Sequence, residues 1–387
     1  MNIVDVILLS LIALSLGFQL VSTRSSLRFF IDAKRPKQSS EDLPPVSVIK
    51  PVTRADAEQI ENFISFFEQD YPAFEVVFSL SRSDETVVSV LENLKNRFPA
   101  KDICWVLNDK NPGPNYKVGN LIGAINSAKF DTLIISDSDI RVGPEYLRRI
   151  VTAFQREGAD IVTCLYRGTR IGNIPSALHA LTIQTDFIPN VIMGYEIEGI
   201  SYAFGATICT SKTVISKFGG LEPIRDYLAD DYQIGFLARQ NGFEVHLSRH
   251  LIDHHSHFAD FSDYFFHQLR WAVTQRVCRP WGYLASGITH GVSLATILLI
   301  TSGFSPLALA VFTVTLIVRL LCFSFLNRKV IHNDEAARYA WLIPIKDWVN
   351  SLIWIFSLFT DRVRWQQRRF RVVRGGRIHE LNEAKKL

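Results

Sequence analysis

The sequence predicts an α/β domain whose mostly parallel sheet is covered by helices on both faces, with membrane helices at both ends of the chain. Short apolar, β-branched runs alternate with amphipathic stretches from residue 46 onward, which is the pattern of a parallel sheet. Charge-free apolar segments at residues 6–22 and 282–318 flank this part of the 387-residue chain. We therefore expect one domain, residues 46–280, held between membrane segments.

The first apolar segment, residues 6–22, is nearly long enough to span a bilayer. Asp5 precedes it, and Arg24 and Arg28 follow it. This polarity argues against a cleaved signal peptide and favours an anchor whose following domain lies in the cytoplasm, although a buried core helix is the alternative. Residues 1–23 are thus predicted to be an N-terminal membrane anchor and residues 24–45 a linker.

Residues 282–318 contain no Asp, Glu, Lys or Arg and are too long for a single span. A turn is indicated at residues 302–306, so we expect a transmembrane hairpin within residues 281–327. The exit from the hairpin is basic, with Arg328 and Lys329, so both of its ends can lie on the cytoplasmic side.

A last apolar stretch, residues 339–359, is interrupted by Pro344, Lys346 and Asp347 and is followed by seven arginines in residues 362–377. A span here would put the basic tail outside, against the positive-inside bias. Residues 328–387 are therefore predicted to contain a re-entrant or interfacial segment and a basic C-terminal tail, with a further span as the alternative.

The strands of the central domain are expected where the apolar runs are shortest and most β-branched. They are residues 46–50, 76–80, 103–107, 133–136 and 161–165. A helix is expected at residues 55–69, and Pro144 is expected to open the helix that follows the fourth strand. No Gly-x-Gly-x-x-Gly follows any of these strands, and no Gly-Lys-Ser/Thr loop is present, which disfavours dinucleotide oxidoreductases and NTPases.

The formal charge is only +4, and much of the basic excess adjoins the apolar segments. An anionic leaflet attracts such residues, so a membrane surface is a better partner than nucleic acid. The five cysteines are scattered without paired spacing, which indicates neither a disulfide framework nor a zinc site and agrees with a reducing cytoplasm.

The pair Asp137 and Asp139 follows directly on the fourth predicted strand. Open α/β sheets place ligands at the carboxyl ends of strands, so both carboxylates are expected in that crevice. Mg²⁺ or Mn²⁺ takes oxygen ligands and shares them with substrate phosphates, which points to a metal holding a nucleotide diphosphate. A strand-end turn with solvated acids is the alternative.

Two further features are expected to serve a nucleotide sugar. Asp84 follows the second strand, where a carboxylate can accept hydrogen bonds from a base or ribose. The segment 115–120 opens a helix, so Lys117 can meet a phosphate near a helix N-terminus, and Asn120 is placed in the same group. A surface lysine is the alternative for Lys117.

The adjacent acids Asp230 and Asp231 stand in an apolar setting, where each raises the pKa of the other, and this suits a general base. Either can instead cap the helix that follows. Arg270 can neutralise a diphosphate, and Trp271 offers a flat face to a sugar or base, although a membrane-interface belt is the competing explanation.

Three histidines, His254, His255 and His257, precede that stretch. With Asp139 they can complete a metal site, for which His255 is the candidate ligand, although imidazole suits Mn²⁺ better than Mg²⁺. The alternative is that these histidines only cap the preceding strand.

Taken in order, these stretches resemble the ceramide glucosyltransferase family, membrane enzymes whose catalytic domain has the GT-A fold. The resemblance runs over nearly the whole chain. It rests on Ser47-Val48-Ile49-Lys50-Pro51, Phe67-Glu68-Gln69-Asp70-Tyr71-Pro72, Asp137-Ser138-Asp139-Ile140-Arg141-Val142, Leu228-Ala229-Asp230-Asp231-Tyr232, Arg270-Trp271 and Arg374-Gly375-Gly376. It implies a mixed GT-A sheet with flanking helices between membrane helices.

The resemblance also implies roles for residues. It assigns Asp84 to the nucleotide, Asp137 and Asp139 to the nucleotide and metal, Asp231 to the base, and Arg270 with Trp271 to the end of the site. The chain departs from the family pattern at His267, where the family commonly has Gln or Arg, and we group His267 with Asp230 as acceptor-side or motif-divergent residues.

The expected activity is inverting transfer of one hexose from a UDP-sugar, with UDP-glucose favoured, to a hydroxyl of a membrane lipid such as ceramide. Family members that move N-acetylglucosamine from UDP-N-acetylglucosamine to a hopanoid lipid are the alternative, and in a bacterium the protein is expected in the inner membrane. A processive polysaccharide synthase and a non-catalytic membrane scaffold are disfavoured, because few spans are predicted and all the acids are present.

Overall fold

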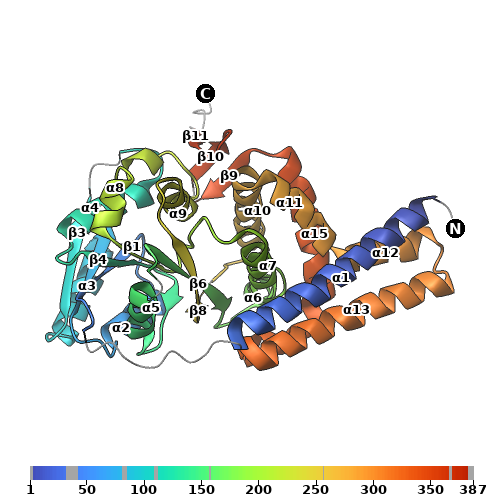
Figure 1. The fold of residues 1–387 in the computed structure, drawn as a ribbon, viewed down its shortest axis with the longest axis horizontal. Coiled ribbons are helices and arrows are strands. Elements are labelled where there is room, and N and C mark those ends of the chain that lie inside the picture. Colours follow the sequence, from blue (N-terminus) through green and yellow to red (C-terminus); the bar gives the residue numbers. More distant parts are fainter. Residues whose placement is uncertain are drawn as a thin grey trace.

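A computed structural model describes residues 3–31, 42–80, 85–108, 112–156, 158–255, 257–365 and 368–381. A sheet with flanking helices forms one end of the molecule, and a group of long helices extends from it (Figure 1). The first described residues lie at the far end of that group, whereas the last described residues lie beside the sheet domain.

Within the described residues, eight strands form one mixed sheet in the order β3-β2-β1-β4-β7-β6-β8-β5. The strands are β1 Val46–Val52, β2 Phe74–Leu80, β3 Asp102–Leu107, β4 Thr132–Ile135, β5 Ile140–Arg141, β6 Ile161–Gly168, β7 Ile208–Ser211 and β8 Val245–His254. All five strands expected from the sequence are present. The half formed by β1 to β4 is parallel, whereas β7 runs antiparallel to both β4 and β6, and β5 runs antiparallel to β8.

The sheet is mixed because β7 and β5 reverse direction, which alternation of apolar runs does not reveal. β7 has four residues and β5 has two, so neither makes a recognisable pattern. Helices cover both faces; in Figure 1, α8 (Lys212–Lys217) and α9 (Asp230–Gln240) lie above the sheet, and α2 (Ala57–Phe67) and α5 (Tyr146–Arg156) lie below it. The core between these layers is apolar, with Ile49, Phe78 and Ile134 fully buried.

The remaining helices of this domain are α3 Glu85–Arg97, α4 Tyr116–Ser127, α6 Ile174–Thr182, α7 Ile188–Glu198 and α10 Phe261–Cys278. Asp56 begins α2 with a capping box, since its side chain accepts from the amide of Gln59 while the Gln59 side chain accepts from the amide of Asp56. A π-helix, Ile183–Phe187, joins α6 to α7. π-Helical turns are rare and often occur at functional sites.

The N-terminal helix α1 spans Ile3–Ile31 and therefore continues through residues 24–31, which the sequence assigned to the linker. This last part is held by the domain. Ser25 Oγ donates to Glu196 at 2.5 Å, and the ring of Phe29 contacts that of Tyr195 with centroids 5.7 Å apart. The predicted linker otherwise lies largely outside the described residues.

The predicted hairpin is formed by α12 (Gly291–Thr301) and α13 (Pro306–Leu326), with its turn at the expected residues. Its first arm is not straight. The short helix α11 (Pro280–Ala285) and the turn after it meet α12 at an angle of 54°. Gly287 lies against Trp354, where a Cβ atom would be 3.0 Å from the indole, so close packing accompanies the bend.

In the part of the chain that the structure describes, three helical segments are long and apolar enough to cross a membrane, or four if the bent pair is one span. They are Ile3–Ile31, Pro306–Ile331 and Ala340–Phe359. The chain is thus built as a membrane protein. The last of the three includes α15 (Ile343–Phe359), for which the sequence favoured a re-entrant or interfacial position.

Both flanks of α15 contact the sheet domain. Before it, Asn333 Nδ2 donates to the carbonyl of Gly168, and after it the amide of Leu228 donates to the carbonyl of Gly376. A helix with both ends on one side of the bilayer does not cross it. These contacts favour the interfacial arrangement, which stays a prediction.

A small antiparallel sheet follows α15. Its strands are β9 (Arg362–Trp365), β10 (Arg368–Val372) and β11 (Ile378–Glu380). Its apolar face, which includes Val363 and Phe370, packs with Leu269 and Val273 of α10. The expected basic tail is therefore a folded element attached to the domain.

Candidate active site

Acidic residues from two distant segments meet at the edge of the sheet where β4 ends. Asp137 follows β4, and Asp230 lies in the first turn of α9. Lys117, in the first turn of α4, joins them, because its Nζ lies 2.7 Å from Asp137 Oδ1 and 3.0 Å from Asp230 Oδ2. The convergence of acids that the sequence predicted is present for these residues.

Lys117 is held in place by the start of its helix. Asn115 caps α4 by accepting from the amides of Lys117 and Val118, and its Nδ2 donates to the carbonyl of Tyr227 just before α9. Burial lowers the pKa of Lys117, but the neighbouring carboxylates of Asp137 and Asp230 outweigh it and hold that pKa well above the usual range. The ammonium therefore stays charged and already has two partners, so contact with a phosphate stays a prediction.

Gly205 links the two acidic segments through its main chain, and the sequence analysis did not identify it. Its amide donates to Asp231 Oδ2 at 2.9 Å, and its carbonyl accepts from the amide of Asp137 at 3.0 Å. A Cβ atom at this position would lie 2.5 Å from Asp137 Oδ2 and 3.1 Å from Lys117 Nζ. A side chain at this position would displace the Asp137 carboxylate, and no sequence motif indicates the position.

Asp231 has the properties of a proton acceptor. Burial, together with the negative charges of Asp230 and Asp137, raises the pKa of its carboxyl from 3.8 to about 6. One oxygen accepts from Gly205 and the other from the amide of Tyr232 at 2.8 Å, so the group is oriented by the main chain. A carboxylate with a pKa near the working pH is suited to take a proton from an alcohol.

Asp139 lies two residues beyond Asp137, where the chain enters β5. Its Oδ2 lies 3.3 Å from His254 Nε2, and its carbonyl accepts from the amide of His255. Burial works to raise the pKa of Asp139, but His254 and Lys50 lower it to about 2, so the carboxyl is ionised. The ring that contacts Asp139 is thus that of His254, whereas His255 contributes its main chain.

The second oxygen of Asp139, Oδ1, is buried and has no hydrogen-bond partner among the described residues. An ionised, unpartnered oxygen is suited to a cation. Within the described ranges, no three His, Cys, Asp or Glu side chains are grouped closely enough to bind an ion by themselves. The residues therefore fit a divalent ion that takes most of its ligands from phosphates and water.

Lys50 is a second residue that sequence reasoning missed, although it is part of the quoted Ser47-Val48-Ile49-Lys50-Pro51 stretch. It is fully buried within β1, with Nζ 2.6 Å from the carbonyl of Asp137 and 3.8 Å from the ring centroid of Phe66. Burial lowers its pKa to about 7 despite the nearby charges of Asp139 and Asp137. The signal in the sequence that could have identified Lys50 was a charged residue within a strand predicted to be buried.

Arg270 approaches the same acids from α10. Burial lowers the pKa of its guanidinium, whereas the negative charges of Asp231 and Asp137 act to raise it. Its guanidinium carbon lies 5.9 Å from the ring centroid of Trp365 in β9. The C-terminal sheet therefore supports the arginine that the sequence placed in the site.

Trp271 and His267 belong to a cluster of rings that we call the aromatic wall. It consists of Tyr166, His179, Phe187, Phe204, His267 and Trp271. His267 and Trp271 lie 4.7 Å apart, and His179 is within 5.2 Å of both. Burial lowers the pKa of both histidines well below 6.5, so the rings are neutral.

Two ring nitrogens of this wall, His179 Nε2 and His267 Nδ1, are buried without a partner in the described part of the chain, whereas His179 Nδ1 lies 2.7 Å from Gln268 Nε2. His179 was not singled out in the sequence. Asn120 is buried on α4, and its Oδ1 likewise has no partner. Asp84 lies outside the described residues, so its predicted contact with the nucleotide stays a prediction.

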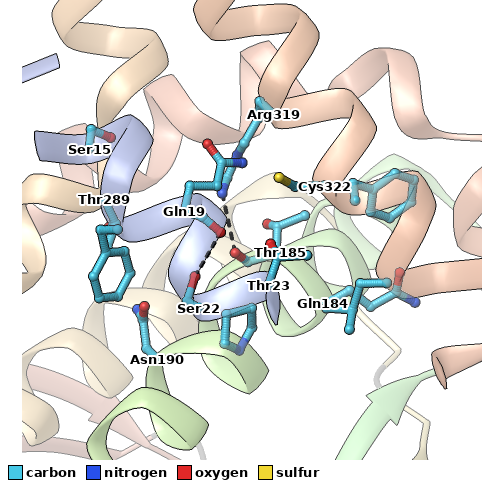
Figure 2. Close-up of a pocket in the computed structure, with 14 residues that line it drawn as sticks. Ser15, Gln19, Ser22, Thr23, Gln184, Thr185, Asn190, Thr289, Arg319 and Cys322 are labelled. Carbon is cyan, nitrogen blue, oxygen red and sulfur yellow. Dashed lines mark hydrogen bonds between the residues drawn. The ribbon is translucent and has the colours of Figure 1, made fainter. Parts of the chain in front are cut away.

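A separate polar pocket lies among the long helices (Figure 2). It is lined by α1, α13 and the π-helix. Gln184 of the π-helix is buried, and neither atom of its side-chain amide has a hydrogen-bond partner among the described residues. Phe187 of the same π-helix contacts Tyr166 and Trp271, so this short element separates the pocket from the aromatic wall.

Next to this pocket, four charged side chains form a buried ionic network. Arg319 pairs with Asp186 and Asp347 at 2.5 and 2.7 Å, and Lys346 pairs with the same two acids at 2.8 and 2.5 Å. Two positive and two negative charges balance. The network ties α13 and α15 to the π-helix and explains why the expected interruptions of the last apolar stretch are tolerated.

A mixed sheet with acids gathered after β4 is the arrangement expected of the GT-A fold. The fold is similar to that of the mannosyltransferase PcManGT from Pyrobaculum calidifontis, solved in complex with GDP-Man and Mn²⁺. The TM-score is 0.54 at 16% sequence identity, over 92% of this chain and 97% of that one.

The chain belongs to glycosyl transferase family 21, whose model matches residues 7–378. Ceramide glucosyltransferase 1 of Caenorhabditis elegans is 24% identical over 354 residues, which are 89% of this chain and 75% of the worm protein. Ceramide glucosyltransferase of Komagataella phaffii is 32% identical over 136 residues, 33% of this chain and 27% of the yeast protein. The expected family and the GT-A fold are therefore confirmed.

Proposed function

We propose that the protein is a UDP-sugar-dependent lipid hexosyltransferase, which moves one hexose, glucose favoured, to a hydroxyl of a membrane lipid such as ceramide with inversion at the anomeric carbon. The observation that carries the proposal is Asp231, a carboxyl with a pKa of about 6 beside the acids that follow β4. The names of the worm and yeast relatives support the sugar and the lipid.

In the proposed reaction, Asp231 accepts the proton of the lipid hydroxyl as that oxygen attacks the anomeric carbon. The bond between the anomeric carbon and the diphosphate breaks, and the nucleotide diphosphate departs with the electron pair. The main-chain amides of Gly205 and Tyr232 orient the carboxylate for this step. General-base assistance of this kind contributes roughly 10²- to 10⁴-fold in rate.

The donor diphosphate is proposed to lie between Asp139 and Arg270. A bound Mg²⁺ or Mn²⁺ would neutralise charge on the diphosphate, and Asp139 would hold it through Oδ1, with Asp137 nearby. Arg270 supplies the second positive charge, and Lys117 keeps Asp137 and Asp230 in position. Electrostatic stabilisation of the leaving group is usually the larger contribution to the rate.

The aromatic wall is proposed to guide the acceptor lipid, with His267 and His179 presenting nitrogen atoms to its polar part. The wall continues through Phe187 into α7, and α7 packs against the anchor helix α1. A two-chain lipid leaves a bilayer at a cost of about 0.8 kcal/mol per methylene, so the site must be held at the membrane. We propose that residues 181–200, which include Phe187, contribute to this acceptor wall.

We further propose that the sheet domain lies in the cytoplasm, anchored by α1 and by the hairpin, with α15 in the interface. Arg24 and Arg28 follow the apolar part of α1, and Arg328 and Lys329 follow α13, in accord with the positive-inside bias.

The test is to supply membranes containing the protein with labelled UDP-glucose or UDP-N-acetylglucosamine and with ceramide, hopanoid or total lipid extracts. We expect a single-hexose glycolipid, identified by its mass, with the β-configuration from an α-linked donor. A product that grows into a polymer, or labelled UDP-sugar that yields no lipid product with any extract, would contradict the proposal.

A further inference from the structure

The outer face of the C-terminal sheet is built from arginines that stand opposite one another. Arg364 of β9 pairs in register with Arg369 of β10, and Arg362 pairs with Arg371. All four side chains are exposed, whereas their neighbours Val363 and Phe370 are buried on the other face. We call these four residues the arginine face.

Like charges directly opposite in an antiparallel ladder destabilise it. The sheet keeps two such pairs side by side. Asp361 forms an ion pair with Arg371 at 2.7 Å, and one carboxylate leaves the face with a large excess of positive charge. His379 of β11 stands in register with Arg371 and is exposed as well, so the position opposite Arg371 on that side carries an imidazole rather than an acid. An anionic partner would turn this unfavourable arrangement into a binding surface.

The chain leads directly from an apolar helix into this face. Phe356 and Phe359 at the end of α15 are 55% and 84% exposed. Phe266 of α10 is exposed too, and the guanidinium carbon of Arg364 lies 5.9 Å from its ring centroid. Exposed aromatic rings beside basic residues are the composition of a protein surface at the level of lipid headgroups.

We propose that the arginine face binds the headgroups of anionic phospholipids in the leaflet that carries the catalytic domain. Charge complementarity and the adjoining exposed rings of α15 select a membrane rather than a soluble polyanion as its partner. This inference goes beyond the proposed transfer reaction, since it assigns a second lipid class to a second surface.

The other face of the same sheet connects this surface with the site. The amide of Leu228 donates to the carbonyl of Gly376, and the amide of Ile378 donates to the carbonyl of Asp226, two and four residues before Asp230. Trp365 lies under the guanidinium of Arg270. Headgroup binding therefore steadies the segment that leads into the proposed base and the arginine of the donor site.

The experiment compares full-length protein in nanodiscs of phosphatidylcholine alone with nanodiscs in which one lipid in three is phosphatidylglycerol. Hydrogen exchange of residues 368–380 is followed by mass spectrometry. We expect exchange to be slowed about tenfold by phosphatidylglycerol in the wild type, and unchanged in a variant with all four arginines replaced by Gln. The readout is independent of catalysis, so it stands whether or not sugar transfer is found.

A control variant removes the same number of positive charges from exposed positions of the catalytic domain. Its substitutions are Arg54→Gln, Arg97→Gln, Arg149→Gln and Arg239→Gln. We expect this variant to keep the lipid-dependent protection. A variant with all four arginines of the face changed to Lys should keep most of it, since the interaction is electrostatic.

Folding is checked with the double variant Arg364→Gln/Arg369→Gln, which removes one opposed pair. Its thermal midpoint in phosphatidylcholine should be equal to or above that of the wild type, because like-charge repulsion is lost. A clear fall in that midpoint would show that the arginines are structural and would overturn the proposal. So would absence of protection in the wild type, protection by UDP-glucose in neutral nanodiscs, or protection by an RNA duplex and not by phosphatidylglycerol.

Discussion

The main-chain amide of Gly205 donates a hydrogen bond of 2.9 Å to Oδ2 of Asp231. The carbonyl of the same glycine accepts from the amide of Asp137. A single peptide segment thereby sets the spacing between the proposed base and the acid at the end of β4, and five predictions follow from this arrangement and its surroundings.

Gly205→Ala should reduce kcat/KM by about tenfold or more, since even a small displacement of a catalytic group lowers the rate strongly. The added methyl group would lie 2.5 Å from Asp137 Oδ2, so the carboxylate must move. Glycolipid formation at limiting acceptor is the measurement. Gly172→Ala is the matched control, because its methyl group meets open space; equal activities of the two variants would argue against the spacing role.

Asp231→Asn should lower kcat by about 10² to 10⁴ while the protein still folds, because the amide oxygen of Asn keeps one of the two main-chain hydrogen bonds but cannot accept the proton. Initial rates and the elution profile on size exclusion should be recorded together. Asp102→Asn, at the exposed edge strand β3, is the control and should retain activity. Unchanged lipid glycosylation by Asp231→Asn would refute the proposed base.

The pH profile of kcat/KM should have an acid limb near pH 6. Burial and the charge of Asp230 raise the pKa of Asp231 from 3.8 to about 6, and the base works only as the carboxylate. Activity is therefore full above this pKa and is lost as the pH falls through it. Asp230→Asn removes the neighbouring negative charge, lowers the pKa of Asp231 and should move the limb to lower pH. A limb that stays in place would mean that another group titrates.

Chelation of divalent ions should abolish transfer, and Mg²⁺ or Mn²⁺ should restore it. Asp139 carries an ionised carboxyl with one buried, unpartnered oxygen. Asp139→Asn should raise the ion concentration for half-maximal activity by about tenfold or more, because the amide carries no charge. Titration of the two ions against activity is the measurement. Full activity in the presence of chelator would show that Arg270 and Lys117 neutralise the diphosphate without a metal.

Asp347→Asn should destabilise the protein by about 3 kcal/mol, since it leaves two buried cations with one anion. Asp347 contacts both Arg319 and Lys346, and these join α13 and α15 to the π-helix. The thermal midpoint in detergent is the measurement. Asp334→Asn, at the exposed start of α14 (Asp334–Ala337), provides the comparison and should have little effect.

Much of the fold could be predicted because local patterns of apolar and turn-forming residues indicate it. The five expected strands are found, and the hairpin turns where Gly303 and Pro306 stand. Alternation did not reveal β7 or β5, which have four and two residues, too few to create a period. The continuation of α1 to Ile31 depends on contacts of Ser25 and Phe29 with α7, and these are tertiary.

The candidate site divides in the same way. Asp137, Asp230 and Asp231 could be identified because charged residues after apolar strands or at helix starts are conspicuous, and the structure gathers them. Lys117 was expected to meet a phosphate, but its two carboxylate partners are known only once α4 and α9 are side by side. The ring against Asp139 is that of His254 rather than His255, because the register between β5 and β8 opposes His254 to Ile140.

The sequence by itself determined the class of fold, the membrane segments and the acids, because each is carried by residue type and short-range spacing. The tertiary structure alone decided that a side chain at Gly205 would displace Asp137, that Lys50 is buried next to the carbonyl of Asp137, and that the C-terminal arginines form one face. These features depend on distances between segments far apart in the chain, which only the packing of the sheet and helices sets.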